Sequence, residues 1–268
     1  MIIGNNKTKY RNELKQIMIY ITGDTHGEND INKLLAENWT ISESLGENDY
    51  LIICGDFGFP FLPTDFSPDP PVSESAKISR YAYEYRCRWL SRRKYTILWV
   101  DGNHDNHNFW YNQPVSCWHG GLVNIHPLAP NVIHLKRGEF YEIDGHTFWT
   151  MGGAKSHDKL TRIPEVSWWE AEIPDYYEMS HGMSVLEEHD YKVDYIITHT
   201  LPSDLEYPVC RCFYSPEPTG VYLNEVYRRT DFKYWFCGHY HFDMEIREQR
   251  ISVLYRNILE TTSGDKAD

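Results

Sequence analysis

Residues 96–105 read Thr-Ile-Leu-Trp-Val-Asp-Gly-Asn-His-Asp. The first five residues of this stretch are apolar, β-branched or aromatic, which is typical of a short strand buried on both faces. The polar residues that follow surround a glycine, which lets the backbone turn tightly and approach a ligand closely. The stretch therefore predicts a buried strand that delivers an amide, an imidazole and a carboxylate to its end.

The same pattern recurs elsewhere in the chain as a short apolar run that ends at polar residues. The runs are Ile17–Thr22 before Gly23-Asp24, Tyr50–Cys54 before Gly55-Asp56, Tyr195–Thr198 before His199, and Tyr234–Cys237 before Gly238-His239. Helices are expected between the strands, around Ile31–Leu45 and Ser75–Arg93. This alternation of elements predicts an α/β sandwich.

The length of 268 residues suits one α/β domain or two small ones. We expect a single domain over residues 17–260, preceded by a polar leader at 1–16 and followed by a tail at 261–268. Two segments within the domain have the composition of surface additions. They are a Pro-rich loop at 57–73, expected to contain no helix, and an aromatic and acidic insertion at 154–190.

The net charge of the chain limits the kinds of ligand that it can bind. The net charge at pH 7 is −13 and the pI is about 5.4. Such a chain repels polyanions at long range, so we expect no long duplex nucleic acid among its ligands. An enzyme that handles phosphate with this balance needs positive charge supplied locally, and bound divalent metals provide it.

The composition of the chain also indicates where in the cell the protein is located. No apolar run approaches the roughly 18 residues needed to span a bilayer, and the first residues lack the apolar core of a signal peptide. Met18 opens the first apolar run and is an alternative start of translation. The six cysteines are scattered, which is typical of reduced thiols. We therefore predict a cytoplasmic protein without a membrane partner; the sequence makes no prediction of oligomeric state.

The polar clusters together offer a mixed set of metal ligands. Loops at the carboxyl ends of strands in an open α/β sheet converge on one crevice. Pooled, the clusters give two carboxylates, one amide and four or five imidazoles, a mixture that suits Mn, Fe, Zn or Ni better than Ca or Mg. Since this is too many ligands for one ion, we expect two divalent ions that share a carboxylate.

These clusters resemble the signature of the calcineurin-like metallophosphoesterase superfamily, whose blocks are D-x-H, G-D, G-N-H-[D/E], H and G-H-x-H. All five occur in family order between residues 23 and 241. They are Gly23-Asp24-Thr25-His26-Gly27, Gly55-Asp56-Phe57, Gly102-Asn103-His104-Asp105, Thr198-His199-Thr200 and Gly238-His239-Tyr240-His241. One block is a weak signal, but five in order after predicted strands are a strong one. The resemblance implies a four-layer α/β/β/α sandwich of two mixed sheets, with a dinuclear metal site at the strand ends.

The resemblance also implies a role for each block. Asp24, His26 and His241 hold the first metal, Asp56 bridges both ions, and Asn103, His199 and His239 complete the second. Manganese is the expected metal, with Fe, Zn or Ni as alternatives. Two such ions lower the pKa of a bridging water, so that a hydroxide attacks the phosphate, and they neutralise charge in the transition state.

His104 adjoins a ligand without being needed for metal, so it is the candidate general acid, a role that contributes about 10²–10⁴-fold. Asp105 follows it and is implied to orient or charge-stabilise its imidazole; a helix N-cap is the alternative. The other eight histidines have no informative spacing and are given no role. They are His107, His119, His126, His134, His146, His157, His181 and His189.

Residues outside the blocks bear on the substrate. The second block lacks the Asp-Arg-Gly continuation of the protein serine/threonine phosphatases, which speaks against a phosphoprotein. Lys155 and Arg162 follow a predicted strand and are candidates for gripping substrate oxygens, with Trp168 or Trp169 stacking on a ring. A surface loop with core-packing tryptophans is the alternative that we favour.

The predicted function is metal-dependent hydrolysis of a phosphate mono- or diester, with a nucleotide among the candidate substrates. A nuclease acting on short or single-stranded nucleic acid is one alternative. A scaffold that keeps the metals only to bind a partner is another, although none of the expected ligands is missing from the sequence.

Overall fold

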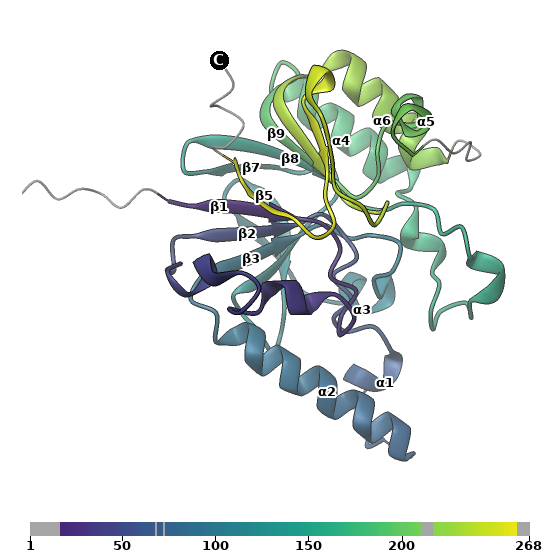
Figure 1. Ribbon diagram of the computed structural model, residues 1–268. Helices are drawn as coiled ribbons and strands as arrows, with labels where there is room; N and C mark the ends of the chain where they lie inside the picture. Colours follow the sequence, from purple (N-terminus) through teal and green to yellow (C-terminus); the bar gives the residue numbers. More distant parts are fainter. Residues whose placement is uncertain (1–16, 68, 72, 211–216, 262–268) are drawn as a thin grey trace, which may run out of the picture.

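Two mixed β-sheets lie face to face at the centre of the computed structural model (Figure 1). The structure describes residues 17–67, 69–71, 73–210 and 217–261. The predicted leader at 1–16, and all but the first residue of the predicted tail at 261–268, lie outside this part of the chain.

The first sheet has seven strands in the order β13-β1-β2-β3-β6-β5-β4. Its centre is parallel, and β13, β5 and β4 are antiparallel to their neighbours. The register aligns Ile21, Ile52, Leu98 and Ile133 across the four parallel strands. The strands are β1 (Ile19–Thr22), β2 (Tyr50–Ile53), β3 (Thr96–Trp99), β4 (Val115–Trp118), β5 (Gly121–Ile125), β6 (Val132–Leu135) and β13 (Ile258–Glu260).

The second sheet has six strands in the order β11-β12-β10-β9-β8-β7. The four inner strands are parallel, and the two outer strands are antiparallel to them. The strands are β7 (Phe140–Ile143), β8 (His146–Met151), β9 (Lys192–Thr198), β10 (Asp231–Cys237), β11 (Met244–Ile246) and β12 (Ile251–Val253).

Helices cover the outer face of each sheet (Figure 1). On the first sheet these are α1 (Pro63–Phe66), α2 (Glu74–Ser91), α3 (His107–Tyr111) and the 3₁₀ turns η1 (Ile31–Leu34) and η2 (Thr40–Glu43). On the second they are α4 (Tyr176–Glu188), α5 (Ser203–Cys210) and α6 (Pro218–Arg229). The remaining 3₁₀ turns are η3 (Lys159–Thr161), η4 (Glu170–Glu172) and η5 (Arg247–Gln249). Within the described residues, none of the helices combines the length and apolar character that crossing a bilayer requires.

Three apolar clusters fill the spaces between these layers. The first joins α2 and α3 to the first sheet, and the third joins α4, α5 and α6 to the second. The central cluster contains side chains of both sheets, such as Ile52 and Leu98 from one and Phe148 and Tyr195 from the other. Three cores between four layers confirm the predicted α/β/β/α sandwich.

The five predicted strands are present, and α2 confirms the helix expected around residues 75–93. The helix expected at Ile31–Leu45 is wrong: Leu35 is extended, and only two 3₁₀ turns form. The packing of Ile31, Leu34 and Trp39 into the core favours this broken path over a helix. The Pro-rich loop at 57–73 does contain a helix, α1, because a proline at the first helical position needs no hydrogen-bond partner.

The segment at 154–190 is not uniform. Its C-terminal part forms α4, which begins with a capping box between Asp175 and Glu178 and buries Leu186 in the third core. Its N-terminal part runs over the strand ends as a loop with two short 3₁₀ turns. This loop carries Ser156, which contacts Asn103, and Arg162, which contacts His104.

Phe148 tests the core between the sheets, since its side chain is fully buried there. Phe148→Ala leaves a cavity that neither sheet can close, so we expect the free energy of unfolding to fall by about 3–5 kcal/mol. Tyr177→Ala is the matched control, because Tyr177 is 80% exposed on α4; its effect should stay within about 0.5 kcal/mol. Urea denaturation followed by tryptophan fluorescence measures both, and equal effects would contradict this account of the core.

Candidate metal centre

The carboxyl ends of β1, β2, β3, β9 and β10 meet at one edge of the two packed sheets. The loops after them carry the seven predicted metal ligands, and the structure brings all seven together. Three strands of the first sheet supply Asp24, His26, Asp56 and Asn103, and two strands of the second supply His199, His239 and His241.

The first group consists of Asp24, His26, Asp56 and His241. One ligand atom of each lies within 4.8 Å of the others. His26 Nε2 is 3.2 Å from Asp56 Oδ2, and His241 Nε2 is 3.3 Å from Asp24 Oδ2. This spacing matches a set of side chains that surrounds one ion.

The second group lies on the other side of Asp56. His199 Nε2 is 3.4 Å from Asp56 Oδ2 and 3.1 Å from Asn103 Oδ1. The ring of His239 is 4.9 Å from the ring of His199, centroid to centroid. Asp56 Oδ2 thus faces both groups, which is the position a bridging carboxylate must occupy.

The carboxylates fit divalent cations. Asp24 and Asp56 are almost completely buried, and one oxygen of each is fixed by a backbone amide: His239 N donates to Asp24 Oδ1 at 2.9 Å, and His104 N donates to Asp56 Oδ1 at 2.6 Å. Among the described residues, no hydrogen bond satisfies the second oxygen, Oδ2, of either group. A buried charge is costly unless it is paired or coordinates a metal, and these oxygens stand beside imidazole nitrogens in a set that suits Mn, Fe or Zn.

Hydrogen bonds orient two of the imidazoles. His199 Nδ1 lies 2.8 Å from the Cys54 carbonyl, and His26 Nδ1 lies 2.7 Å from Asp30 Oδ2. If Nδ1 is the donor in each, Nε2 is left as a lone pair directed at the centre. Metal-binding histidines commonly use their second nitrogen in this way.

The backbone at the site is held in an uncommon conformation. His26, Asp56, His239 and His241 all have φ between 41° and 71°, in the left-handed region. Such conformations are costly for non-glycine residues and cluster at functional sites. Glycine is required at position 238 for a steric reason, because a Cβ there would collide with Asp24 Oδ1.

The proximity of opposite charges shifts several pKa values. Burial alone would raise the pKa of Asp56, but His199 and His26 outweigh it and hold that pKa well below its usual value. Burial alone would lower the pKa of His26, but the nearby carboxylates, Asp56 first, raise it to about 9. The carboxylates therefore stay ionised and attract positive charge to this edge of the sheets.

Lys33, which was not predicted from the sequence, holds the backbone next to the first group. Its ammonium donates hydrogen bonds to the carbonyls of Gly23, Asp24 and Tyr255. Burial lowers the pKa of Lys33 to about 8, although nearby carboxylates oppose the shift. The side chain thus fixes the loop that presents Asp24, and no spacing in the sequence marks this contact.

Asn103 is also held by residues outside the predicted blocks. Its Nδ2 donates to Ser156 Oγ at 3.2 Å, and Ser156 Oγ donates to Glu172 Oε2 at 2.5 Å. The Ser156 backbone amide donates to Glu172 Oε1 at 2.9 Å. Because the Asn103 nitrogen is engaged in this way, its carbonyl oxygen is directed to the second group.

Two histidines that were given no role from the sequence belong to a buried network behind Asn103. Asp101 accepts hydrogen bonds from Arg137 and lies 3.2 Å from His134 Nε2. His107 Nε2 lies 3.2 Å from the carbonyl of Gly102. The network anchors the loop after β3, and its partners come from distant parts of the chain.

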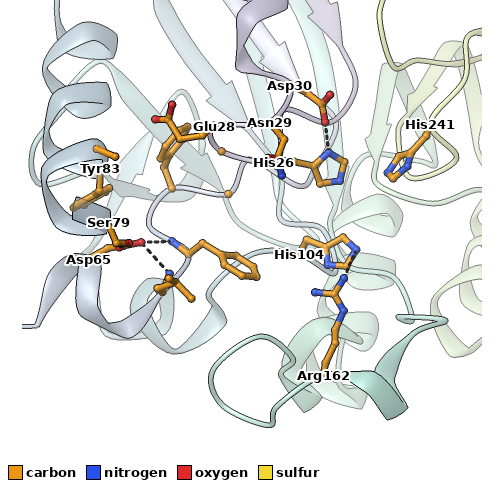
Figure 2. Close-up of a pocket in the computed structure, with 16 residues that line it drawn as sticks. His26, Glu28, Asn29, Asp30, Asp65, Ser79, Tyr83, His104, Arg162 and His241 are labelled. Atoms are coloured by element: carbon orange, nitrogen blue, oxygen red, sulfur yellow. Dashed lines mark hydrogen bonds and ion pairs between the residues drawn. The ribbon is translucent and has the colours of Figure 1, made fainter. Parts of the chain in front are cut away.

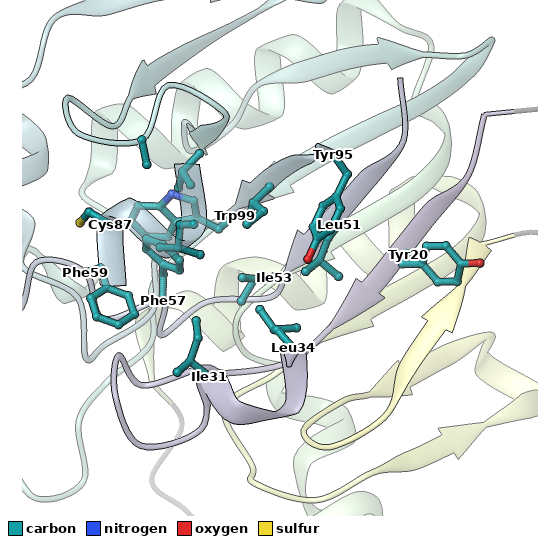
Figure 3. Close-up of a cluster of buried hydrophobic side chains, with 14 of the residues drawn as sticks. Tyr20, Ile31, Leu34, Leu51, Ile53, Phe57, Phe59, Cys87, Tyr95 and Trp99 are labelled. Carbon is teal, nitrogen blue, oxygen red and sulfur yellow. The ribbon is translucent and has the colours of Figure 1, made fainter. Parts of the chain in front are cut away.

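His104 lies beside the centre, with its ring 5.7 Å from the ring of His26. Burial lowers the pKa of His104, and Arg162 adds to the effect while Asp56 opposes it. Arg162 Nη2 is 3.4 Å from His104 Nε2, and the same guanidinium pairs with Asp158 at 2.7 Å. Arg162 thus lines the cavity beside His104 (Figure 2), and its contact with a substrate stays a prediction.

Asp105 makes different contacts from those predicted. Its carboxylate accepts hydrogen bonds from the backbone amides of Gly58 at 2.7 Å, Gly102 at 2.8 Å and Phe57 at 3.3 Å. In the described structure no hydrogen bond joins it to His104, and Asn106, rather than Asp105, caps α3. Asp105 thus ties the Asp56 loop to the Asn103 loop.

The other predicted substrate contacts, Lys155, Trp168 and Trp169, are not among the described residues that line the two cavities at the centre. Trp169 is buried and packs edge-on against Phe61, and Trp168 lies against the Lys159 ammonium at 3.8 Å. Trp169 therefore agrees with the favoured alternative to a ring-stacking role, which was a surface loop whose tryptophans pack into the core.

Two cavities open at the centre. The larger, of about 690 Å³, runs from His26, His104 and His241 towards α2. The smaller, of about 340 Å³, adjoins Asp56, Asn103 and His239. The paired groups are therefore accessible to a ligand from two sides.

Comparison with protein families identifies the class. The model of the calcineurin-like phosphoesterase family matches residues 17–243, which is most of the chain. The protein belongs to this family, and hydrolysis of phosphoesters with metal ions is the activity that the family implies. A search of the curated proteins finds no match.

A substitution at Ser156 tests whether its hydrogen bond to Asn103 orients that metal ligand. Ser156→Ala frees the Asn103 amide to rotate, so we expect manganese affinity to fall about tenfold to a hundredfold, as for other residues that orient metal ligands. Isothermal titration calorimetry measures the affinity, and circular dichroism checks the fold. Ser75→Ala, an exposed serine on α2, is the control. Equal affinity in Ser156→Ala and wild type would show that Ser156 does not position Asn103.

Proposed function

We propose that the protein hydrolyses a phosphate mono- or diester, with two divalent ions held on either side of Asp56. The observation that carries the proposal is the position of Asp56 Oδ2, within 3.4 Å of imidazoles from both groups. In this proposal Asp24, His26 and His241 hold one ion, and Asn103, His199 and His239 hold the other. Manganese is the proposed metal.

Each part of the site has a proposed task. The bound ions would supply an activated water and would neutralise charge on the phosphate. His104 would hold a proton beside the leaving oxygen and transfer it as the ester bond breaks, so that water and ester yield an alcohol and a phosphate. Arg162 would contact a phosphate oxygen. Asp105 would hold the loop that carries Asp56 against the loop that carries Asn103.

A small ester suits the cavity better than a polymer. The cavity of about 690 Å³ has the size of typical small-molecule sites. A net charge of −13 opposes the approach of a long polyanion. A single domain over residues 17–260 and a cytoplasmic location stay predictions.

His104→Ala tests the role of the acid. A p-nitrophenolate leaves without a proton, whereas an alkoxide needs one, so the two classes of ester should respond differently. We expect kcat with manganese to fall about 10²–10⁴-fold on an alkyl ester and much less on bis-p-nitrophenyl or p-nitrophenyl phosphate. Metal content, measured by mass spectrometry, should not change.

His119→Ala is the matched control, because His119 is exposed on the turn between β4 and β5. Equal losses on both classes of ester would argue against a general acid. If wild-type protein with two bound metals hydrolyses no ester at all, the scaffold function replaces the proposed one.

A further inference from the structure

The cleft that passes His104 has two chemically different ends (Figure 2). His26, His104, His241 and Arg162 lie at the end next to the metal centre. The other end, which we call the distal cleft, lies between the loop after β2 and helix α2. It is formed by Phe59, Phe61, Leu62, Ala82 and Tyr83.

The polar groups around the distal cleft already have partners. Asp65 accepts hydrogen bonds from Ser79 Oγ at 2.5 Å and from the Leu62 amide at 2.9 Å. Glu28 forms a two-point ion pair with Arg86 at 2.7 and 3.0 Å. The Tyr83 hydroxyl lies 3.3 Å from His126 Nε2. The distal cleft therefore presents mainly carbon atoms to a ligand.

Charge is distributed unevenly along the cleft. Among the described residues that line it, Arg162 is the single Arg or Lys, and it lies at the metal end. Glu28, Asp30 and Asp65 are the acidic residues of the lining. Asp30 lies beside His26 at the metal end, whereas Asp65, on α1, lies beside the distal cleft. A negatively charged group in the distal cleft would lie near the carboxylate of Asp65. No Arg or Lys among the described residues lines this end, and Arg86 is already paired with Glu28, which disfavours such a group.

The position of His104 sets the direction of the substrate. A general acid must lie next to the oxygen of the leaving group. His104 lines both the smaller cavity at Asp56 and Asn103 and the larger one that leads to the distal cleft. A phosphate at the metals would therefore extend its leaving group past His104 into the distal cleft. The aromatic rings there favour a flat ring over an alkyl chain.

We propose that the distal cleft binds the leaving group, and that the preferred substrate is a phosphate ester of an uncharged alcohol that carries an aromatic ring. This inference rests on the proposed function. A nucleoside and a simple aromatic alcohol share this chemistry, whereas an alcohol that carries a second phosphate or a carboxylate does not.

The test compares three esters whose leaving oxygens have similar chemistry: 2-phenylethyl, ethyl and 2-carboxyethyl phosphate, each as a monoester and as a methyl diester, with manganese. Burial of the ring should raise kcat/KM for the phenylethyl ester about tenfold to a hundredfold over the ethyl ester, and the carboxyethyl ester should be the poorest. Thymidine 5′-phosphate is assayed alongside. Faster hydrolysis than the phenylethyl ester assigns the ring to a nucleobase, and slower hydrolysis assigns it to a simple aromatic alcohol.

Leu62→Asp places a charge in the distal cleft without disturbing the core, since Leu62 is 36% exposed and occupies the N-cap of α1, a position that aspartate favours. We expect this variant to lose the preference for phenylethyl over ethyl, measured as the ratio of the two kcat/KM values. Ile78→Asp adds the same charge on α2 outside the cleft and should retain the preference.

Equal kcat/KM for the phenylethyl and ethyl esters in wild type, or equal losses for both in Leu62→Asp, would overturn the inference and leave the proposed function intact. Failure to hydrolyse any of the esters, with two metals bound, would overturn the proposed function itself. The two failures are thus distinguishable.

Discussion

The site depends on two buried carboxylates, Asp24 and Asp56, which follow two neighbouring strands of the first sheet. Asp24 and Asp56 are both inaccessible to solvent, and each commits one oxygen to a backbone amide and leaves the other towards the centre. Two like charges in such a place need positive neighbours, because burial without a partner is costly. The imidazoles around them, and the cations that we propose, meet this requirement.

The sandwich positions these groups by bringing strand ends of both sheets to one edge. The first sheet supplies both carboxylates, and the second supplies His199, His239 and His241. Three features then hold the loops in place: Lys33 beneath Asp24, Asp105 between two loops, and the Asp101–Arg137 pair behind Asn103. Four of the proposed ligands also have left-handed backbone, a conformation that persists only where the surrounding structure holds it.

The sequence predicted what is encoded locally. Apolar runs that end in Asp, His or Asn predicted the five strands, and their blocks predicted which side chains would meet. The helix at Ile31–Leu45 was wrong because tertiary packing of Trp39 and its neighbours decided the local conformation. The contacts of Ser156 with Glu172 and of His134 with Asp101 join residues far apart in the chain, so no spacing could have revealed them.

Anomalous diffraction from crystals soaked in manganese tests the central claim most directly. The account predicts two peaks about 3.5–4 Å apart, with Asp56 between them, Asp24, His26 and His241 around one, and Asn103, His199 and His239 around the other. A single peak, or two peaks without Asp56 as a shared ligand, would contradict it.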